Sequence, residues 1–337
     1  MRVAVAGLGF MGLTHLKGFA DTPGVEVAAV SSNDPKALSG DLSHIQGNLG
    51  VEGATFDFSR MEKYEDAFDC VRRAQVDAVD LCLPTSLHAP VTIAALEAGK
   101  HVLVEKPMAL DVAECRCMID ASRAAGRILM CAQVLRFFPH YETLAEAFRG
   151  GLIGAVRHAL FRRRCAAPGW GGWLRDRAVS GGGVFDLLIH DVDQMQFLFG
   201  APRAVSAWGH EDLPAGIDLL TAVYEYEGFS VTITGGWHHL KDYPFSMECT
   251  IVGDAGLVDY SSEGRTPSFY AAGGGYDPLW IQKKDGYQSE IEYFVECCRE
   301  NRQPEICPPE ASLNAVGLMR LAELSRSRNG EKVPCTI

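Results

Sequence analysis

The chain has 337 residues, more than a single hydrophobic core serves efficiently, so about 150 residues per domain predicts roughly two domains. Hydrophobic residues make up 47% of the chain and charged residues 22%, which is typical of an ordered globular protein. The formal net charge of -12 argues against binding to nucleic acid or to an anionic membrane surface, and it favours a small-molecule partner.

The 11 cysteines do not indicate a disulfide framework, because their number is odd and pairs such as Cys115/Cys117 lie in helix-like stretches. The spacing of zinc ligands is missing too, so no metal is expected. Reduced thiols are typical of a cytoplasmic protein. The N-terminus is interrupted by glycines too early for a signal peptide, and no apolar run approaches the roughly 18 residues of a membrane span.

The first 133 residues alternate short Val- and Ala-rich runs with longer amphipathic stretches, which is the pattern of β-α-β units in a parallel sheet. The predicted strands are Arg2–Ala6, Val25–Ser31, Ala78–Leu83, His101–Val104 and Ile128–Ala132. We therefore expect a Rossmann domain over residues 1–133 that binds NAD or NADP.

A glycine motif follows the first of these strands and leads into a predicted helix. Its residues are Gly7, Gly9, Phe10, Met11 and Gly12, in the spacing G-x-G-x-x-G. Glycines allow the backbone to turn tightly and to approach a pyrophosphate, whose charge the helix N-terminus attracts. The strand-turn-helix context favours dinucleotide binding over a simple structural turn.

The residues after the second strand bear on the choice between the two cofactors. An acidic residue that holds the ribose 2′-hydroxyl of NAD is expected there, but the sequence carries Ser32. Ser32, Asn33 and Lys36 could receive the 2′-phosphate of NADP, whereas Asp34 could serve NAD if the strand ends later. This favours NADP slightly, and a plain polar turn would leave the choice open.

Two further segments lie at carboxyl ends of predicted strands, where α/β sheets bind ligands. The first contributes Leu83, Pro84, Thr85 and His88, and the second contributes Glu105 and Lys106, followed by Pro107. A lysine in this place can stabilise negative charge on a reacting oxygen. The alternative is a solvated surface cation paired with Glu105.

Residues 134–337 change to longer alternating segments, which read as antiparallel strands, with several helices. The strands are Phe161–Arg164, Ala204–His210, Leu219–Tyr226, Phe229–Trp237, Met247–Val252 and Leu257–Tyr260, and the helices are Val184–Phe199, Glu290–Glu300 and Ala311–Ser327. The predicted class is α/β, with a Rossmann parallel sheet followed by an α+β domain that has a large, mainly antiparallel open sheet.

A polar stripe interrupts the apolar helix that follows Gly181-Gly182-Gly183. Asp186, His190 and Asp193 fall at i, i+4 and i+7, so they share one face. An imidazole one turn from a carboxylate can be oriented as a general base. A hydrogen-bonded core histidine is the alternative, and metal binding is disfavoured because three ligands on one helix converge poorly.

The motifs together carry a resemblance to a known family. GLGFMG, LPTSLH, EKP, LRFFPHY and SGGGVFDLLIHDVD, in this order, resemble the Gfo/Idh/MocA oxidoreductases, which include glucose-fructose oxidoreductase and inositol dehydrogenase. The resemblance covers nearly the whole chain. It implies a substrate-binding and oligomerisation domain over residues 134–337, a homodimer or homotetramer, and a site between the two domains.

The resemblance also implies roles for single residues. Lys106 would be the catalytic lysine, Asp186 and His190 would handle the hydroxyl proton, and Arg136 and Trp173 would lie near the substrate. The implied reaction moves a hydride between nicotinamide and a hydroxyl or carbonyl carbon of a sugar, polyol or related compound. Two alternatives are a non-catalytic NAD(P)-binding regulator and an NAD-dependent glycosidase.

Other side chains are weaker candidates for the substrate pocket. Arg162 and Arg164 share one face of a strand and could meet a carboxylate or phosphate, although an exposed sheet face is the commoner explanation. Several aromatic side chains could contact a sugar ring or could simply be buried or exposed: Trp170, Trp173, His238 and His239.

Overall fold

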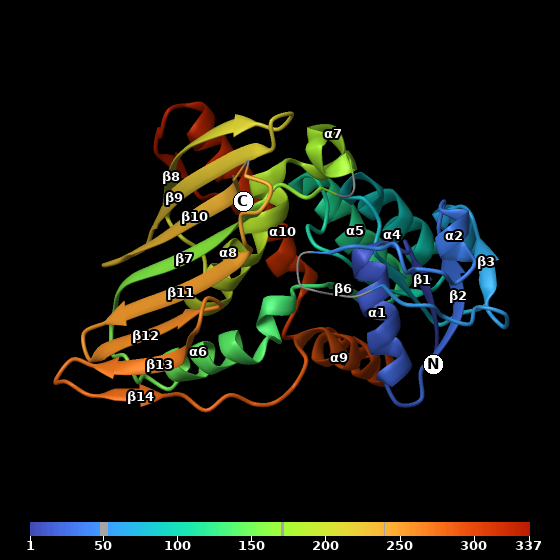
Figure 1. The fold of residues 1–337 in the computed structure, drawn as a ribbon, viewed down its shortest axis with the longest axis horizontal. Helices are drawn as coiled ribbons and strands as arrows, with labels where there is room; N and C mark the ends of the chain where they lie inside the picture. The colour runs from blue at the N-terminus through green and yellow to red at the C-terminus, as the bar shows by residue number, and fades with distance from the viewer. Residues whose placement is uncertain (48–52, 170–171, 239) are drawn as a thin grey trace. The chain divides into compact units, whose positions relative to one another are not determined.

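The computed structural model describes residues 1–47, 53–169, 172–238 and 240–337. Contacts divide the chain into two compact units, Met1–Val134 with Asp285–Leu313, and Leu135–Lys284 with Asn314–Ile337 (Figure 1). The sequence placed residues 285–313 in the second domain. They group with the first unit because helix α9 (Gly286–Glu300) packs on α1 (Phe10–Asp21), with Ile291 against Gly18.

The first unit contains a parallel six-stranded sheet in the order β3-β2-β1-β4-β5-β6. Its strands are β1 (Arg2–Ala6), β2 (Glu26–Ser31), β3 (Glu62–Tyr64), β4 (Ala78–Leu81), β5 (His101–Val104) and β6 (Leu129–Cys131). Its other helical segments are α2 (Pro35–Leu38), α3 (Ala67–Arg73), η1 (Thr85–Leu87), α4 (His88–Glu97) and α5 (Val112–Ala125). The strand order reverses between β1 and β4, the place where open α/β sheets bind ligands.

The Rossmann sheet predicted from the sequence is confirmed. The strands β4, β5 and β6 are buried along their whole length, as expected for a parallel sheet covered on both faces. The short, partly exposed edge strand β3 was not predicted, because its sequence Glu-Lys-Tyr has no apolar run.

The second unit contains a nine-stranded sheet in the order β14-β13-β12-β11-β7-β10-β9-β8-β15. Its strands are β7 (Val156–Ala166), β8 (Ala204–Asp212), β9 (Ile217–Glu225), β10 (Ser230–His238), β11 (Ser246–Gly253), β12 (Gly256–Ser261), β13 (Arg265–Ala271), β14 (Tyr276–Pro278) and β15 (Val333–Pro334). Neighbours pair antiparallel except β7 and β10, which run parallel because α8 and the β8–β9 pair intervene. The large, mainly antiparallel sheet is confirmed.

Helices cover one face of this sheet. They are α6 (Pro139–Arg149), α8 (Gly183–Phe199) and the later part of α10 (Pro309–Ser327), and short turns η2 (Val134–Arg136), η3 (Gly172–Arg175) and α7 (Arg177–Ser180) precede α8. Burial alternates along β7, where Ala159, Phe161, Arg163 and Cys165 face the helices. The other face of the sheet therefore carries the intervening, less buried side chains.

Two general features concern the whole described chain. Every one of the eleven cysteines is a thiol in the structure. Within the described ranges, no helix has both the length and the apolar character needed to cross a bilayer.

Candidate active site

The turn between β1 and α1 contains two glycines that close packing requires, Gly7 and Gly12, and a third, Gly9, at the N-terminus of α1. A Cβ on Gly7, whose φ is +97°, would lie 2.2 Å from the carbonyl oxygen of Cys82, and one on Gly12 would lie 1.9 Å from that of Gly7. Among the described residues, no atom lies within 4 Å of the Cβ position at Gly9, the N-cap of α1. The open N-terminus of α1 therefore fits the pyrophosphate of a dinucleotide.

The polar turn after β2 is organised by Asp34. The Oδ1 atom of Asp34 accepts a hydrogen bond from the Lys36 backbone N–H at 2.9 Å, and its Oδ2 atom lies 2.8 Å from Nε2 of His44. Ser32 Oγ accepts from the Asp34 N–H at 3.1 Å. These contacts engage the carboxylate of Asp34, and Lys36 Nζ lies 3.5 Å from Asp41 Oδ2 at the surface. Ser32 is half-buried, and Asn33 and Lys36 are exposed at the end of β2.

A buried histidine joins the two segments at the ends of β4 and β5. His88 Nδ1 lies 2.7 Å from the carbonyl oxygen of Pro107, and Nε2 lies 2.8 Å from that of Leu83. Burial lowers the pKa of His88, and the contacts with the two carbonyl oxygens act in the opposite direction. Thr85, also buried, begins the short η1 turn between these contacts.

Lys106 lies at the end of β5, where its backbone is fixed by the preceding carboxylate. Oε2 of the buried Glu105 accepts a hydrogen bond from the Lys106 N–H at 2.9 Å. Oε1 of Glu105 lies 3.3 Å from Nε2 of His15 on α1. On the other side of the ring, Nδ1 of His15 lies 3.0 Å from both carboxylate oxygens of Asp80 on β4.

The charges of this buried group support one another. Burial by itself lowers the pKa of His15, but the contacts with Asp80 and Cys82 together outweigh burial, and the pKa lies well above the ordinary value of 6.5. Burial raises the pKa of Glu105, but the contact with His15 and the charge of Lys106 bring it below its ordinary value. His15 is therefore an imidazolium between two carboxylates.

Neither His15 nor Asp80 was singled out from the sequence. A signal was present: His15 follows the glycine motif by three positions on the buried face of α1, and Asp80 interrupts an otherwise apolar strand. Such buried charged groups need partners, but the sequence does not say which partners they have.

The same region offers one arrangement of metal-binding groups among the residues described. Ligand atoms of His15, Asp80 and Cys82 lie within 4.8 Å of one another. Burial raises the pKa of the Cys82 thiol far above its ordinary value, which disfavours the thiolate that metals bind. Because the imidazole already bridges two carboxylates, we keep the expectation of no metal as a prediction.

In the second unit, helix α8 carries the predicted polar stripe, but its members differ in environment. Asp186 and His190 are half-buried, one turn apart on the same face. Asp193 is 1% exposed, and both of its oxygens accept hydrogen bonds from the Arg136 guanidinium at 2.7 Å. Arg136 and Asp193 are thus committed to each other as a bidentate buried pair.

The remaining candidates also have structural partners. Trp173 packs against a buried cluster that includes Leu174, Leu187 and Trp237. Arg162 and Arg164 both bind Glu248 on the neighbouring strand β11, and His238 stacks on Tyr243 at 4.6 Å between ring centroids. Trp170 and His239 lie outside the described residues.

Comparison with known proteins decides the family. Residues 1–133 match the oxidoreductase family described as having an NAD-binding Rossmann fold, and residues 141–259 match the GFO/IDH/MocA C-terminal domain. The myo-inositol 2-dehydrogenase of Thermotoga maritima is 32% identical over 319 residues, which cover 91% of this chain and 90% of the relative. The chain belongs to the GFO/IDH/MocA oxidoreductase family.

Other GFO/IDH/MocA relatives extend over nearly the full length. The scyllo-inositol 2-dehydrogenase (NAD(+)) of Bacillus subtilis is 26% identical, with 99% of this chain and 96% of the relative covered. The aldose-aldose oxidoreductase of Caulobacter crescentus superposes with a TM-score of 0.82 at 25% identity, covering 99% of both chains. The resemblance and the NAD-binding oxidoreductase class predicted from the sequence are confirmed.

Proposed function

We propose that this chain is an NAD(P)-dependent dehydrogenase or reductase that acts on a CH–OH or carbonyl carbon of a sugar, polyol or related compound. The observation that carries the proposal is that Lys106 lies at the carboxyl end of β5, on the same sheet edge as the open glycine turn after β1. Relatives named as inositol dehydrogenases support the substrate class.

The proposed roles follow from the chemistry of each group. When bound, the nicotinamide supplies the hydride acceptor for oxidation and the donor for reduction. The Lys106 ammonium donates a hydrogen bond to the reacting oxygen and stabilises the negative charge that develops there. His190 accepts the hydroxyl proton during oxidation, and Asp186, one turn earlier on α8, orients the imidazole.

The test is a screen of inositols, sugars and sugar acids with both oxidised and both reduced cofactors. We expect turnover with at least one polyol or sugar. Lys106→Ala and His190→Ala should each reduce kcat by about 10²–10⁴-fold, while the dissociation constant of the reduced cofactor stays unchanged. Lys63→Ala and His210→Ala, at exposed positions in the first and second unit, are the matched controls.

The screen also separates the competing functions. Near-normal rates in both variants would overturn the assignment of these residues. Binding of cofactor without turnover of any compound indicates a regulator, and cleavage of a glycoside without net reduction of the cofactor indicates a glycosidase.

For the cofactor, we propose a preference for NADP. Ser32 stands where a carboxylate would hold the ribose of NAD, and Asn33 and Lys36 add polar and cationic groups beside it. Fluorescence titration should give a lower dissociation constant for NADPH than for NADH. Ser32→Asp should reverse this order, and tighter binding of NADH by the unmodified protein would contradict the proposal.

We also propose that residues 1–133 supply the cofactor site and that residues 134–337 supply the substrate contacts and the oligomer interface. The sheet face with the less buried side chains of β7 supports a homodimer or homotetramer, and the eleven thiols support a cytoplasmic location. Light scattering after size-exclusion chromatography tests the oligomeric state, and a single monomer peak would contradict the proposed oligomer.

A further inference from the structure

The N-terminus of helix α8 is held from outside the helix. Gly181 and Gly182, the N-cap, both have positive φ values, +86° and +106°, and glycine offers no side chain to cap the helix. Instead, Oδ2 of Asp218 on β9 accepts a hydrogen bond from the Val184 N–H at 2.9 Å. Asp218 is fully buried, so this carboxylate from a neighbouring strand serves as the cap.

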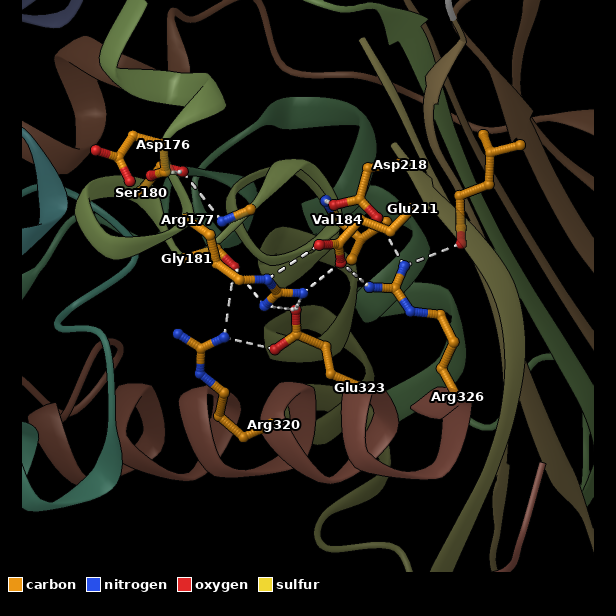
Figure 2. Close-up of polar contacts among 12 residues, drawn as sticks. Asp176, Arg177, Ser180, Gly181, Val184, Glu211, Asp218, Arg320, Glu323 and Arg326 are labelled. Carbon is orange, nitrogen blue, oxygen red and sulfur yellow. Dashed lines mark hydrogen bonds and ion pairs between the residues drawn. The ribbon is translucent and has the colours of Figure 1, made fainter. Parts of the chain in front are cut away.

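A chain of ion pairs neutralises this buried carboxylate. Oδ1 of Asp218 lies 2.6 Å from Nη1 of Arg326 on α10, and Nη2 of Arg326 lies 2.6 Å from Glu211 on β8 (Figure 2). Glu211 in turn binds the guanidinium of Arg177 on α7 through two contacts. Because Asp218 has a cationic partner, its burial does not leave an uncompensated charge.

The same network also holds the glycine turn itself. Arg177 and Arg320 both donate to the carbonyl oxygen of Gly181, at 3.2 and 3.4 Å, and both bind Glu323 on α10, at 3.1 and 2.5 Å. Arg320 lies over the ring of Phe185 in the first turn of α8, with its guanidinium carbon 3.7 Å from the ring centroid. Figure 2 shows Arg177 of α7 and Arg320 and Glu323 of α10 close to Gly181.

The network joins three arginines and three carboxylates, so its formal charge is zero. Packing closes the remaining side of the turn, since a Cβ on Gly183 would lie 2.6 Å from the ring of Trp237 on β10. The start of α8 is therefore fixed by hydrogen bonds to the Val184 N–H in its first turn and to the Gly181 carbonyl oxygen just before the helix. Asp186 lies in this first turn, and His190 lies one turn further on.

We propose that Asp218 and Arg326 are positioning residues for Asp186 and His190, acting through the first turn of α8. The proposal rests on the proposed function, in which these two side chains handle the hydroxyl proton. A displacement of about 1 Å at such groups costs on the order of 10²-fold in rate, even when the altered residue does not touch the substrate. A purely structural role would lower stability but leave kcat of the folded protein unchanged.

The experiment compares Asp218→Ala, Asp218→Asn and Arg326→Gln with the conservative Arg326→Lys. We expect Asp218→Ala to lower kcat by about 10–100-fold with KM of the substrate within about threefold. Asp218→Asn and Arg326→Gln should have smaller effects of the same kind, and Arg326→Lys should recover part of the loss in Arg326→Gln. The cofactor dissociation constant should stay unchanged, because these residues belong to the second unit.

Glu225→Gln is the matched control, because Glu225 lies on the same strand as Asp218 but pairs with the exposed Lys332. Unchanged kcat in the folded Asp218→Ala and Arg326→Gln variants would overturn the proposal. If Asp218→Ala does not fold, Arg326→Gln and Arg326→Lys decide, because they leave the Asp218–Val184 hydrogen bond in place.

A second measurement tests the positioning role of Asp218 independently of whether the proposed dehydrogenase function is correct. The ring resonances of His190, followed by nuclear magnetic resonance, should shift in Asp218→Asn and stay unchanged in Glu225→Gln. If the unmodified protein turns over no sugar or polyol, the proposed function is wrong. In that case, unchanged His190 resonances in Asp218→Asn would also overturn the proposal that Asp218 positions His190.

Discussion

The Lys106 segment of the first unit and the first turn of α8 in the second are both held by buried polar contacts, but these contacts differ in kind. Lys106 depends on histidines, since His15 pairs with Glu105 and His88 bridges two carbonyls. The α8 turn depends on arginines paired with carboxylates. Histidine titrates near physiological pH and arginine does not, so the two supports should respond differently to pH.

The largest effect on stability is expected for His15→Ala. Removal of the imidazolium takes away the buried cation between Asp80 and Glu105, which should lower the free energy of unfolding by about 3–5 kcal/mol, although Lys106 still lies beside Glu105. Hydrogen exchange of α1 and β4 in increasing denaturant measures this loss. His210→Ala, at an exposed position on β8, should change stability by less than about 0.5 kcal/mol. A loss below about 1 kcal/mol in His15→Ala would mean that His15 does not support these carboxylates.

Glycine substitutions compare the packing of the two regions. Gly12→Ala and Gly183→Ala should each lower the free energy of unfolding by about 1–3 kcal/mol, because the new Cβ would meet the Gly7 carbonyl oxygen and the Trp237 ring, respectively. Gly9→Ala is the control, because no described residue lies within 4 Å of its Cβ position. It should unfold at the same temperature as the unmodified protein but bind NADPH more weakly, and unchanged binding would contradict the cofactor site.

The pH dependence sharpens the contrast further. Because the pKa of His15 is raised in the folded protein, its stabilisation is complete below 6.5 and is lost as pH rises through the folded value. The pKa of Glu105 is lowered, so its stabilisation is present above 4.5 and is lost as pH falls. Each unit of pKa shift corresponds to about 1.4 kcal/mol.

Hydrogen exchange at pH 6, 8 and 9, corrected for the intrinsic rate, tests this behaviour region by region. Protection of α1 should decline towards pH 9, and protection of the first turn of α8 should not. His15→Asn should remove the alkaline decline in α1. An equal decline in the protection of α1 and of the first turn of α8 would contradict the proposed difference between the histidine contacts and the arginine ion pairs.

The smallest effect is expected for the exposed pair on β9. Glu225→Gln breaks its contact with Lys332, whose side chain is 60% exposed, and should cost about 0–1 kcal/mol. Added salt should weaken this pair in the unmodified protein and leave the buried Asp218–Arg326 pair largely unaffected. Thermal unfolding at two salt concentrations, with Arg326→Gln for comparison, measures both.

Much of the architecture could be predicted from local sequence patterns. Strands β1 and β5 have the predicted bounds, and α8 begins one residue before its predicted start, because apolar periodicity and glycine punctuation are local properties. The strand-end position of Lys106 and the shared helix face of Asp186 and His190 were also determined locally. Their roles in catalysis remain proposals.

The buried contacts that hold these side chains in place could not be predicted, because each contact joins residues that are distant in the chain. His15 meets Asp80 across 65 positions, Val184 meets Asp218 across 34, and Asp218 meets Arg326 across 108. Asp193, on the same helix face as His190, proved to be the buried partner of Arg136. The sequence by itself determined which elements form and which charged groups lie on them, whereas the tertiary structure alone decided which charges meet, since buried charges select partners by proximity in space.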